Sequence, residues 1–378
     1  MTTGHPGIIW TLLSFLAVIG PLIFVHELGH YLVGRWFGVK ADVFSIGFGR
    51  ELAGWTDRRG TRWKLSLLPL GGYVKFAGDM NPASQASPEW LMLPPEERAR
   101  TFQAKPVWQR FLIVLAGPAT NFLIGILVVA GFAWHYGVPA TPPLVAGVEA
   151  GSAAAAAGVR AGDVVTSVDG ARIERFEDIY DAVVMRPGER VVLGVNRGGR
   201  AIQLPVTVRA FVAKDDFGNS GTIGRLGILR PAAAVRSLSL PEALGAGVQA
   251  TRRIVSMTVS GIGQIIVGKR SVKELGGPLK IAKYSGEQAS LGWLSLVAFI
   301  AAISINLGFI NLLPIPMLDG GHLLFYAIEA VRREPLKPEA QEWAFRTGLA
   351  ALLALMIFVT FNDLASFGLW SKLGGLIG

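Results

Sequence analysis

Uncharged apolar runs recur along this chain and predict membrane-spanning helices. Residues 7–25, 111–134 and 291–318 contain no Asp, Glu, Lys or Arg, and residues 347–362 form a shorter uncharged run. A helix needs about 20 residues to cross the hydrocarbon core of a bilayer. The first three runs are long enough, and the fourth is long enough if it continues to about Trp370. We therefore predict a polytopic α-helical membrane protein with about four transmembrane helices.

A fifth uncharged run has a different character. Residues 254–268 are rich in glycine and follow Arg252 and Arg253 directly. A helix with this composition is typical of the membrane surface, where its apolar face enters the lipid and its basic face stays in water. We assign residues 231–290 to an amphipathic, interfacial segment, and a fifth span is the alternative.

Between the second and third apolar runs the pattern changes to short apolar strands separated by glycine turns. The stretch "AGVRAGDVVTSVDG" (157–170) resembles a bacterial PDZ domain, which would cover about residues 143–211. PDZ domains bind extended peptide ends by strand addition. We therefore expect a PDZ-like α+β domain within residues 136–230 that contacts a peptide or a substrate ectodomain, and a spacer that binds nothing is the alternative. The Asp, Asn and Gly content of residues 211–227 predicts a flexible connection.

Composition and charge limit the function classes. The chain has 378 residues, of which 51% are hydrophobic and 17% charged, and its mean hydropathy is +0.44. It has no cysteine, which excludes disulfides and thiolate metal sites, so a metal must be held by histidine and carboxylate side chains. The net charge of +9 is explained by topology signals and contacts with anionic lipid headgroups, and we expect no nucleic-acid partner.

The loop charges predict an orientation in the membrane. Residues 35–110 hold twelve Lys and Arg residues, and the connection 319–346 adds four more, so both loops are expected in the cytoplasm. Residues 136–290 then lie on the opposite, periplasmic side of a bacterial inner membrane. In this scheme residues 1–135 and 291–378 are the two parts of the membrane domain, and the active site lies toward the cytoplasmic side.

The stretch "GPLIFVHELGHYLVGRWFG" (20–38) places His26, Glu27 and His30 within an apolar run. Charged groups in a membrane span are costly, by about 2.5–3.5 kcal/mol each on insertion scales, and they usually mark a functional site. Residues four apart lie on one face of a helix, so the two histidines can bind one metal ion together. Glu27 lies beside them, where it can act as a general base. This is the His-Glu-x-x-His pattern of zinc hydrolases.

A catalytic zinc ion usually takes three protein ligands and keeps one position open for water. The candidates for the third ligand lie in "NLGFINLLPIPMLDGGHLL" (306–324), where Pro314 and Pro316 interrupt the third apolar run. Asp319 and His322 both follow these prolines, and both residue types bind zinc. Spacing alone leaves both open.

Several motifs together resemble the site-2 proteases, a family of intramembrane zinc metalloproteases, and most closely the bacterial regulator-of-sigma-E proteases. The similarity covers about residues 20–365. The segments that carry it are "HELGH" (26–30), "RWKLSLLPLGGYVKFAGD" (62–79), "LAGPATNFLIG" (115–125), "GGPLKIAK" (276–283), "NLLPIPMLDGGHLL" (311–324) and "FND" (361–363). Two departures are visible. Arg50 replaces a proline that often follows Gly-Phe-Gly in the family, and the chain has room for one PDZ-like domain where close relatives carry two.

The resemblance implies a role for individual residues. It assigns one zinc ion per chain to His26, His30 and Asp319, and it makes Glu27 the general base. It also implies that residues 62–79 form a membrane-re-entrant β-hairpin. We expect two further groups of residues around the site. The substrate-binding residues are Gly71, Gly72, Tyr73, Asn306, Asn311, Pro314 and Pro316, and the supporting or structural residues are Gly117, Pro118, Asn121 and His322.

These features predict an intramembrane zinc metalloprotease. Its expected substrates are transmembrane helices of single-span membrane proteins, such as anti-sigma factors already trimmed by a first protease, or remnant signal peptides. Its expected role is regulated intramembrane proteolysis in a stress response. The alternatives are a zinc-binding transporter or sensor, for which a base beside the metal has no use, and an inactive scaffold that works through its PDZ-like domain.

Overall fold

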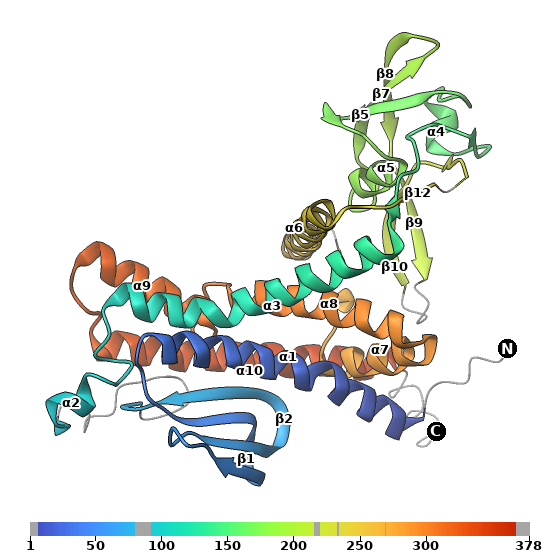
Figure 1. Ribbon diagram of the computed structural model, residues 1–378. Helices are drawn as coiled ribbons and strands as arrows, with labels where there is room; N and C mark the ends of the chain where they lie inside the picture. The colour runs from blue at the N-terminus through green and yellow to red at the C-terminus, as the bar shows by residue number, and fades with distance from the viewer. Residues whose placement is uncertain (1–6, 80–91, 215–219, 233, 269, 368–378) are drawn as a thin grey trace. The chain divides into compact units, whose positions relative to one another are not determined.

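The computed structural model describes residues 7–79, 92–214, 220–232, 234–268 and 270–367. The chain divides into two compact units (Figure 1). The first unit combines residues 1–128 with residues 275–378, and the second unit contains residues 129–274. The second unit is therefore inserted into the first.

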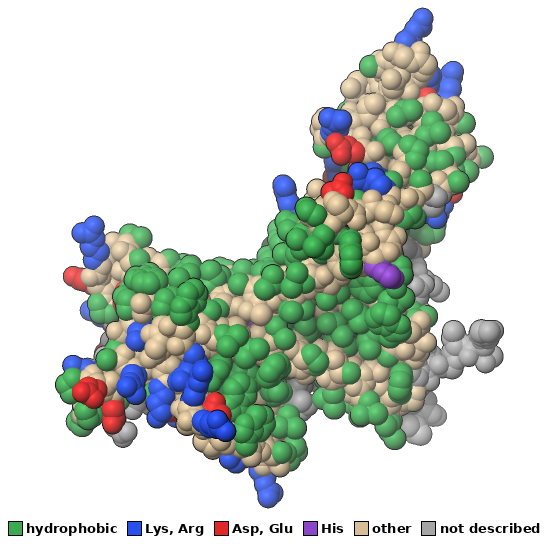
Figure 2. Space-filling view, viewed as in Figure 1, with side chains coloured by type: hydrophobic (Ala, Val, Ile, Leu, Met, Phe, Trp, Pro, Cys, Tyr) green, Lys and Arg blue, Asp and Glu red, His purple; other side chains and the backbone are tan. Residues whose placement is uncertain are grey.

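The first unit is built from long apolar helices and one β-hairpin. Its elements are α1 (Ile8–Trp36), β1 (Ala41–Thr56), β2 (Arg62–Phe76), α2 (Pro95–Arg98), α3 (Val107–Tyr136), which continues into the second unit, α7 (Pro278–Leu291), α8 (Trp293–Asn311), α9 (Asp319–Arg332) and α10 (Pro338–Ser366). Hydrophobic side chains cover much of the surface of these helices, and Lys and Arg side chains gather over the hairpin and α2 (Figure 2).

Within the described part of the chain, four helices are long and apolar enough to cross a membrane, as the sequence predicts. They are Ile8–Trp36, Val107–Tyr136, Trp293–Asn311 and Glu339–Ser366. The fourth begins earlier than the uncharged run at 347–362 and continues past Asp363, whereas its predicted extension to Trp370 lies outside the described residues. The surface of these helices is apolar because lipid, not water, is its expected solvent.

Small residues bring the membrane helices close together. A Cβ atom on Gly29 of α1 would lie 2.5 Å from the carbonyl oxygen of Ala116 on α3, so the two backbones meet directly there. At Gly125 of α3, the absence of a side chain leaves room for the side chain of Ile305 on α8. The hydroxyl of Ser304 on α8 also donates a hydrogen bond to the carbonyl oxygen of Asn121, at 2.8 Å. These contacts are typical of helix packing in membranes.

β1 and β2 form a curled antiparallel hairpin that packs against α1. The prediction of a hairpin within residues 62–79 is wrong in its bounds, because residues 62–76 form one strand whose partner is β1. Residues 43–46 of β1 lie beside two stretches of β2, 62–65 and 72–75. β1 bends after Gly47, whose φ of 90° is unfavourable for residues with a side chain. Phe44 is 1% exposed and stacks on Trp63 with ring centroids 4.3 Å apart. The hairpin is therefore anchored by an aromatic core at its base.

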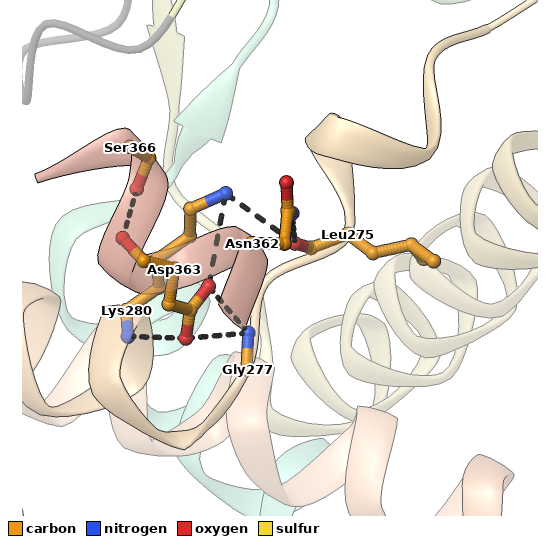
Figure 3. A network of polar contacts seen from close by, with 6 residues as sticks. All are labelled: Leu275, Gly277, Lys280, Asn362, Asp363 and Ser366. Carbon is orange, nitrogen blue, oxygen red and sulfur yellow. Dashed lines mark hydrogen bonds and ion pairs between the residues drawn. The ribbon is translucent and has the colours of Figure 1, made fainter. Parts of the chain in front are cut away.

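Two motifs that are distant in the sequence meet where the chain re-enters the first unit. Asp363 of α10 is fully buried, and its carboxylate accepts hydrogen bonds from the backbone N–H groups of Gly277 and Lys280, each at 3.1 Å (Figure 3). The amide of Asn362 donates to the carbonyl oxygen of Leu275 at 3.0 Å. Since Gly277 precedes α7, the Asp363 carboxylate caps the start of this helix.

The second unit holds short strands, short helices and one long helix, with a main apolar core and a smaller cluster of Ala133, Leu238 and Ala243. Its elements are β3 (Val138–Pro139), β4 (Gly147–Val148), α4 (Ala153–Ala156), β5 (Val164–Val168), β6 (Ala171–Arg172), α5 (Phe176–Val183), β7 (Arg190–Arg197), β8 (Arg200–Thr207), β9 (Arg209–Lys214), β10 (Ser220–Arg225), β11 (Ile228–Leu229), β12 (Val235–Arg236), α6 (Leu240–Ile266) and the 3-10 helix Val272–Glu274. The main sheet has the strand order β6-β5-β7-β8. Val145, Val165 and Leu193 are fully buried in its core.

The sequence alone predicts a structure for residues 211–227 and for the segment that forms helix α6. The prediction of a flexible connection at residues 211–227 is wrong for the described residues, because β9 and β10 pair as an antiparallel hairpin. Strand pairing supplies the backbone hydrogen bonds that local composition did not indicate. α6 is a single long helix that is not among the candidate spans, and its interfacial position stays a prediction.

Candidate metal centre

α1 carries the two histidines and the glutamate on its buried side. His26, Glu27 and His30 are 8%, 8% and 9% exposed. They lie in the C-terminal half of the first candidate span. The helix places His26 one turn before His30, and their Nε2 atoms are 3.3 Å apart.

Asp319 begins α9 and completes a triangle with the two histidines. Its Oδ2 lies 3.1 Å from Nε2 of His26, and its Oδ1 lies 3.5 Å from Nε2 of His30. Ligand atoms about 2.0–2.1 Å from a tetrahedral zinc ion lie about 3.3 Å from one another. The separation of 3.3 Å between the histidine Nε2 atoms fits this value, and each carboxylate oxygen of Asp319 lies within a similar distance of one histidine. One ligand atom from each of the three residues lies within 4.8 Å of the others. Among the described residues, this is the group of histidine and carboxylate side chains that could hold a metal ion.

A backbone carbonyl on α3 orients His30. The Nδ1 atom of the His30 ring lies 2.9 Å from the carbonyl oxygen of Ile113. A carbonyl oxygen only accepts hydrogen bonds, so Nδ1 must carry the ring proton, and Nε2 keeps its lone pair for a metal. Sequence reasoning missed Ile113, because its contribution comes from the backbone and leaves no signal in the side chain.

Asn121 on α3 contacts the other histidine. Its side-chain amide lies 3.1 Å from Nδ1 of His26, while its Oδ1 is buried without a hydrogen-bond partner. A half-turn of the amide about the Cβ–Cγ bond directs Oδ1 at the ring. The His26 Nδ1–H group then donates to Oδ1 and leaves the Nε2 lone pair free for a metal, so this amide orientation is the one compatible with metal binding. This contact would orient a candidate metal ligand from outside the metal-binding triangle.

Two glycines let the backbones of α3 and β2 come close to the side chains of His30 and Glu27. A Cβ atom on Gly117 of α3 would lie 2.5 Å from Cε1 of His30, so no side chain fits there. A Cβ atom on Gly72 of β2 would lie 2.9 Å from Cγ of Glu27. The hairpin therefore contacts α1 at the glutamate that the sequence predicts as general base.

The third-ligand alternatives separate in space. The imidazole of His322 packs against Phe345 with ring centroids 5.0 Å apart, and it is not part of the group that could hold a metal ion, whereas Asp319 is. The geometry favours Asp319 as the ligand. His322 instead occupies the interface between α9 and α10.

The remaining predicted residues of α8 and the loop after it make contacts outside the metal-binding triangle. Asn306 donates a hydrogen bond to the carbonyl oxygen of Ala302 in its own helix, at 3.1 Å, and Asn311 is the last residue of α8. Pro314 is exposed, and Pro316 lies against α10, where a Cβ atom on Gly348 would come within 2.6 Å of its carbonyl oxygen.

The other predicted positions lie on the hairpin and on α3. Tyr73 stacks on Phe48 with ring centroids 5.9 Å apart, and Gly71 also approaches Phe48. Pro118 directs its carbonyl oxygen at Gly308 of α8, where a Cβ atom would lie 3.0 Å away. These contacts support the hairpin and the α3–α8 packing.

Comparison with known proteins identifies the family. The sequence model of peptidase family M50 matches residues 14–355. The chain belongs to peptidase family M50. It is 44% identical over 360 residues to a protein of Agrobacterium fabrum named as a zinc metalloprotease, with 94% of this chain and 96% of the relative covered. It is 36% identical over 394 residues to metalloprotease MmpA of Caulobacter vibrioides, with 98% and 99% covered.

This M50 protein is thus a zinc metalloprotease, and M50 is the family of the site-2 proteases. A solved PDZ domain of an SdrC-like protein from Listeria monocytogenes is also similar, with 24% identity, a TM-score of 0.18, and coverage of 22% of this chain and 84% of that domain. The family and its relatives establish the enzyme class, and the described geometry shows which side chains of this M50 protease can meet at one metal ion.

Proposed function

We propose that this M50 protease cleaves the transmembrane helices of single-span membrane proteins within the bilayer. The observation that carries the proposal is the triangle formed by His26, His30 and Asp319, because two of its members lie on a candidate membrane span. One zinc ion per chain would be held there. Bound zinc would polarise the scissile carbonyl and lower the pKa of water to about 7.

Glu27 is the general base in this proposal. It lies between the two histidine ligands in the sequence and is buried with them. A carboxylate in this place can accept a proton from the attacking water and return it to the leaving amine. The low dielectric of the site strengthens these interactions, because little water competes for the same groups.

The hairpin is proposed to enter the membrane and hold the unwound substrate. Leu65, Leu67 and Leu68 on β2 are 46%, 55% and 52% exposed, which suits contact with lipid or with an apolar peptide. An extended substrate can add to the edge of a strand. Gly71, Gly72 and Tyr73 lie on β2, whose backbone approaches Glu27. The peptide backbone would also be bound by residues of α8 and of the segment after it, namely Asn306, Asn311, Pro314 and Pro316.

The inserted unit is proposed to lie in the periplasm of a bacterium and to contact substrate ectodomains or peptide ends. An apolar groove between α5 and residues 223–228 supports this contact, since it is lined by Phe176, Ile179 and Tyr180 on one side. Substrates would be proteins such as anti-sigma factors trimmed by another protease, or remnant signal peptides. The sequence pattern at residues 157–170 favours the PDZ-like interpretation.

A direct test uses purified protein in liposomes with a labelled single-span substrate. The wild-type protein should release a fragment cut within the transmembrane segment, and Glu27→Gln should reduce the rate by at least about 100-fold while zinc content is retained. Cleavage by Glu27→Gln at the wild-type rate would refute the role of Glu27. A zinc-loaded wild type that moves zinc across the liposome but cuts no membrane substrate would favour the transporter alternative.

A further inference from the structure

One face of α3 supports the metal centre over several turns. Arg110, Ile113, Gly117 and Asn121 follow one another at intervals of three or four residues, so they lie along one stripe of the helix. Ile113 accepts a hydrogen bond from His30, and Gly117 leaves room for the same ring. Asn121 contacts His26. Arg110 begins this stripe and contacts α9, the helix that carries the third ligand.

Arg110 forms a buried ion pair with Glu329. Its Nη2 lies 2.6 Å from Oε1 of Glu329, and the two side chains are only 15% and 14% exposed. The guanidinium also lies over the ring of Tyr326, 5.0 Å from its centroid, and its Nε donates to the carbonyl oxygen of Lys105 at 3.1 Å. A buried charge strongly favours the geometry in which its partners are in reach.

The residues of α9 that contact Arg110 share a stripe with the proposed zinc ligand. Asp319, Tyr326 and Glu329 are separated by seven and three residues, so they lie on one side of α9. Asp319 and Glu329 are about 15 Å apart along the helix axis, and Arg110 and Asn121 are about 16 Å apart along α3. The ion pair and the metal centre are therefore separated by similar lengths along both helices.

These contacts close a loop of three helices. α3 is joined to α1 by the Ile113–His30 and Asn121–His26 contacts, α1 meets α9 at Asp319, and α9 returns to α3 at Glu329. Figure 1 shows the start of α3 beside α9. An apolar hollow lies next to the ion pair, between Trp108 and Phe111 of α3 and Ala327 of α9. Ile113 and Val114 of α3 also pack with Leu323 and Tyr326 of α9 in one buried cluster. The ion pair adds a directional contact to this apolar packing.

We infer that Arg110 is a positioning residue for the metal centre. Together with Glu329 it fixes the rotation and the axial position of α9, so that the Asp319 carboxylate reaches both histidines. The inference rests on the proposed ligand set of His26, His30 and Asp319. It assigns a function to an ion pair whose members lie outside the metal-binding triangle.

The test measures zinc affinity by competition with a chelator, and the visible spectrum of the cobalt-substituted protein, in the full chain. Arg110→Met should lower zinc affinity about ten-fold or more and change the cobalt spectrum, because the aspartate ligand is displaced. Arg110→Lys keeps the charge and should lose less affinity. Glu342→Gln is the matched control, since Glu342 pairs with Arg346 at 2.6 Å but is exposed on α10; its affinity should stay within about two-fold of wild type.

Further variants separate positioning from a general loss of stability. Arg110→Glu combined with Glu329→Arg restores opposite charges at the same place, and it should bind zinc more tightly than either single variant. The inference would be overturned if Arg110→Met had the zinc affinity and the cobalt spectrum of the wild type. It would also be overturned if the folded double variant Arg110→Glu/Glu329→Arg bound zinc no more tightly than the single variants. If Arg110→Met does not fold, Arg110→Lys and Glu329→Gln decide by the same two measurements. Failure of the ligand set is distinguishable, because Asp319→Ala would then bind zinc like wild type.

Discussion

Gly117 lies directly against the imidazole of His30, with room for no Cβ atom between them. Gly117→Ala should therefore displace the ring or separate α3 from α1, and zinc content should fall clearly. Gly131→Ala is the matched control, because it lies in the same helix with nothing within 4 Å of the added atom. It should be neutral or slightly stabilising, by up to about 1 kcal/mol. Metal analysis of the purified variants checks both expectations, and equal zinc content in the two would contradict the close approach.

The metal ligands can be tested by removing them one at a time. His26→Ala and Asp319→Ala should lose most of the bound zinc, because two protein ligands hold the ion far less tightly than three. His322→Ala should retain zinc, since its ring packs against Phe345 instead. Zinc per chain is measured by metal analysis after dialysis. If Asp319→Ala keeps full zinc and His322→Ala loses it, the third ligand is His322.

Asn121 should act through an oxygen that accepts a hydrogen bond from His26. Asn121→Leu removes this acceptor and should weaken zinc binding about 10–100-fold, as is usual for residues that orient a ligand. Asn121→Asp keeps an acceptor at the same position and should bind zinc more tightly than Asn121→Leu. Chelator competition gives the two affinities. Equal affinities would show that Asn121 only fills space.

The inserted unit should lose stability at acid pH. Two hydrogen bonds from the Arg197 guanidinium, at 2.7 and 2.8 Å, lower the pKa of the buried Asp163 below its ordinary value. Because the folded pKa lies below the unfolded one, the stabilisation is fully present above about pH 5 and is lost as the pH falls through the folded pKa. Asp163→Asn should cost about 1–3 kcal/mol at neutral pH and flatten this acid dependence.

Hydrogen exchange of amides in β5 and β7 of the full chain measures this stability. Glu174→Gln is the control, because Glu174 pairs with Arg172 at the surface with 69% of its side chain exposed, and it should leave exchange unchanged. The opening free energy of β5 and β7 is obtained from the exchange rates after correction for intrinsic exchange. If it stays constant in the wild type from pH 7 to pH 3, the ion pair of Asp163 and Arg197 does not stabilise the unit as predicted.

The predicted orientation gives opposite results for two reporter fusions. A reporter fused after residue 85 should be active in the cytoplasm, because the loop 35–110 is rich in Lys and Arg. A reporter fused near residue 200 should be active only on the periplasmic side. Activity profiles of periplasm-specific and cytoplasm-specific reporters check this. The reverse pattern would place the inserted unit in the cytoplasm and remove its proposed contact with ectodomains.

The sequence by itself determined the parts of this protein that depend on local periodicity. Uncharged runs of sufficient length predicted the four candidate spans, because the width of a bilayer sets the length of a helix. The spacing of His26 and His30 placed both on one helix face, and the absence of cysteine left histidine and carboxylate as the metal ligands. The helix inferences need only residues within a few turns of one another, and the inference from cysteine needs only the composition of the chain.

Tertiary structure decided everything that depends on residues far apart. Asp319 and His322 are equally competent as ligands, and only the position of α9 brings Asp319 to the histidines while His322 faces Phe345. The carbonyl oxygen of Ile113 orients His30 without any side-chain signal. Arg110 and Glu329 are separated by 219 residues, so no local pattern could pair them. Such contacts follow from how helices pack, which the period of a single helix does not specify.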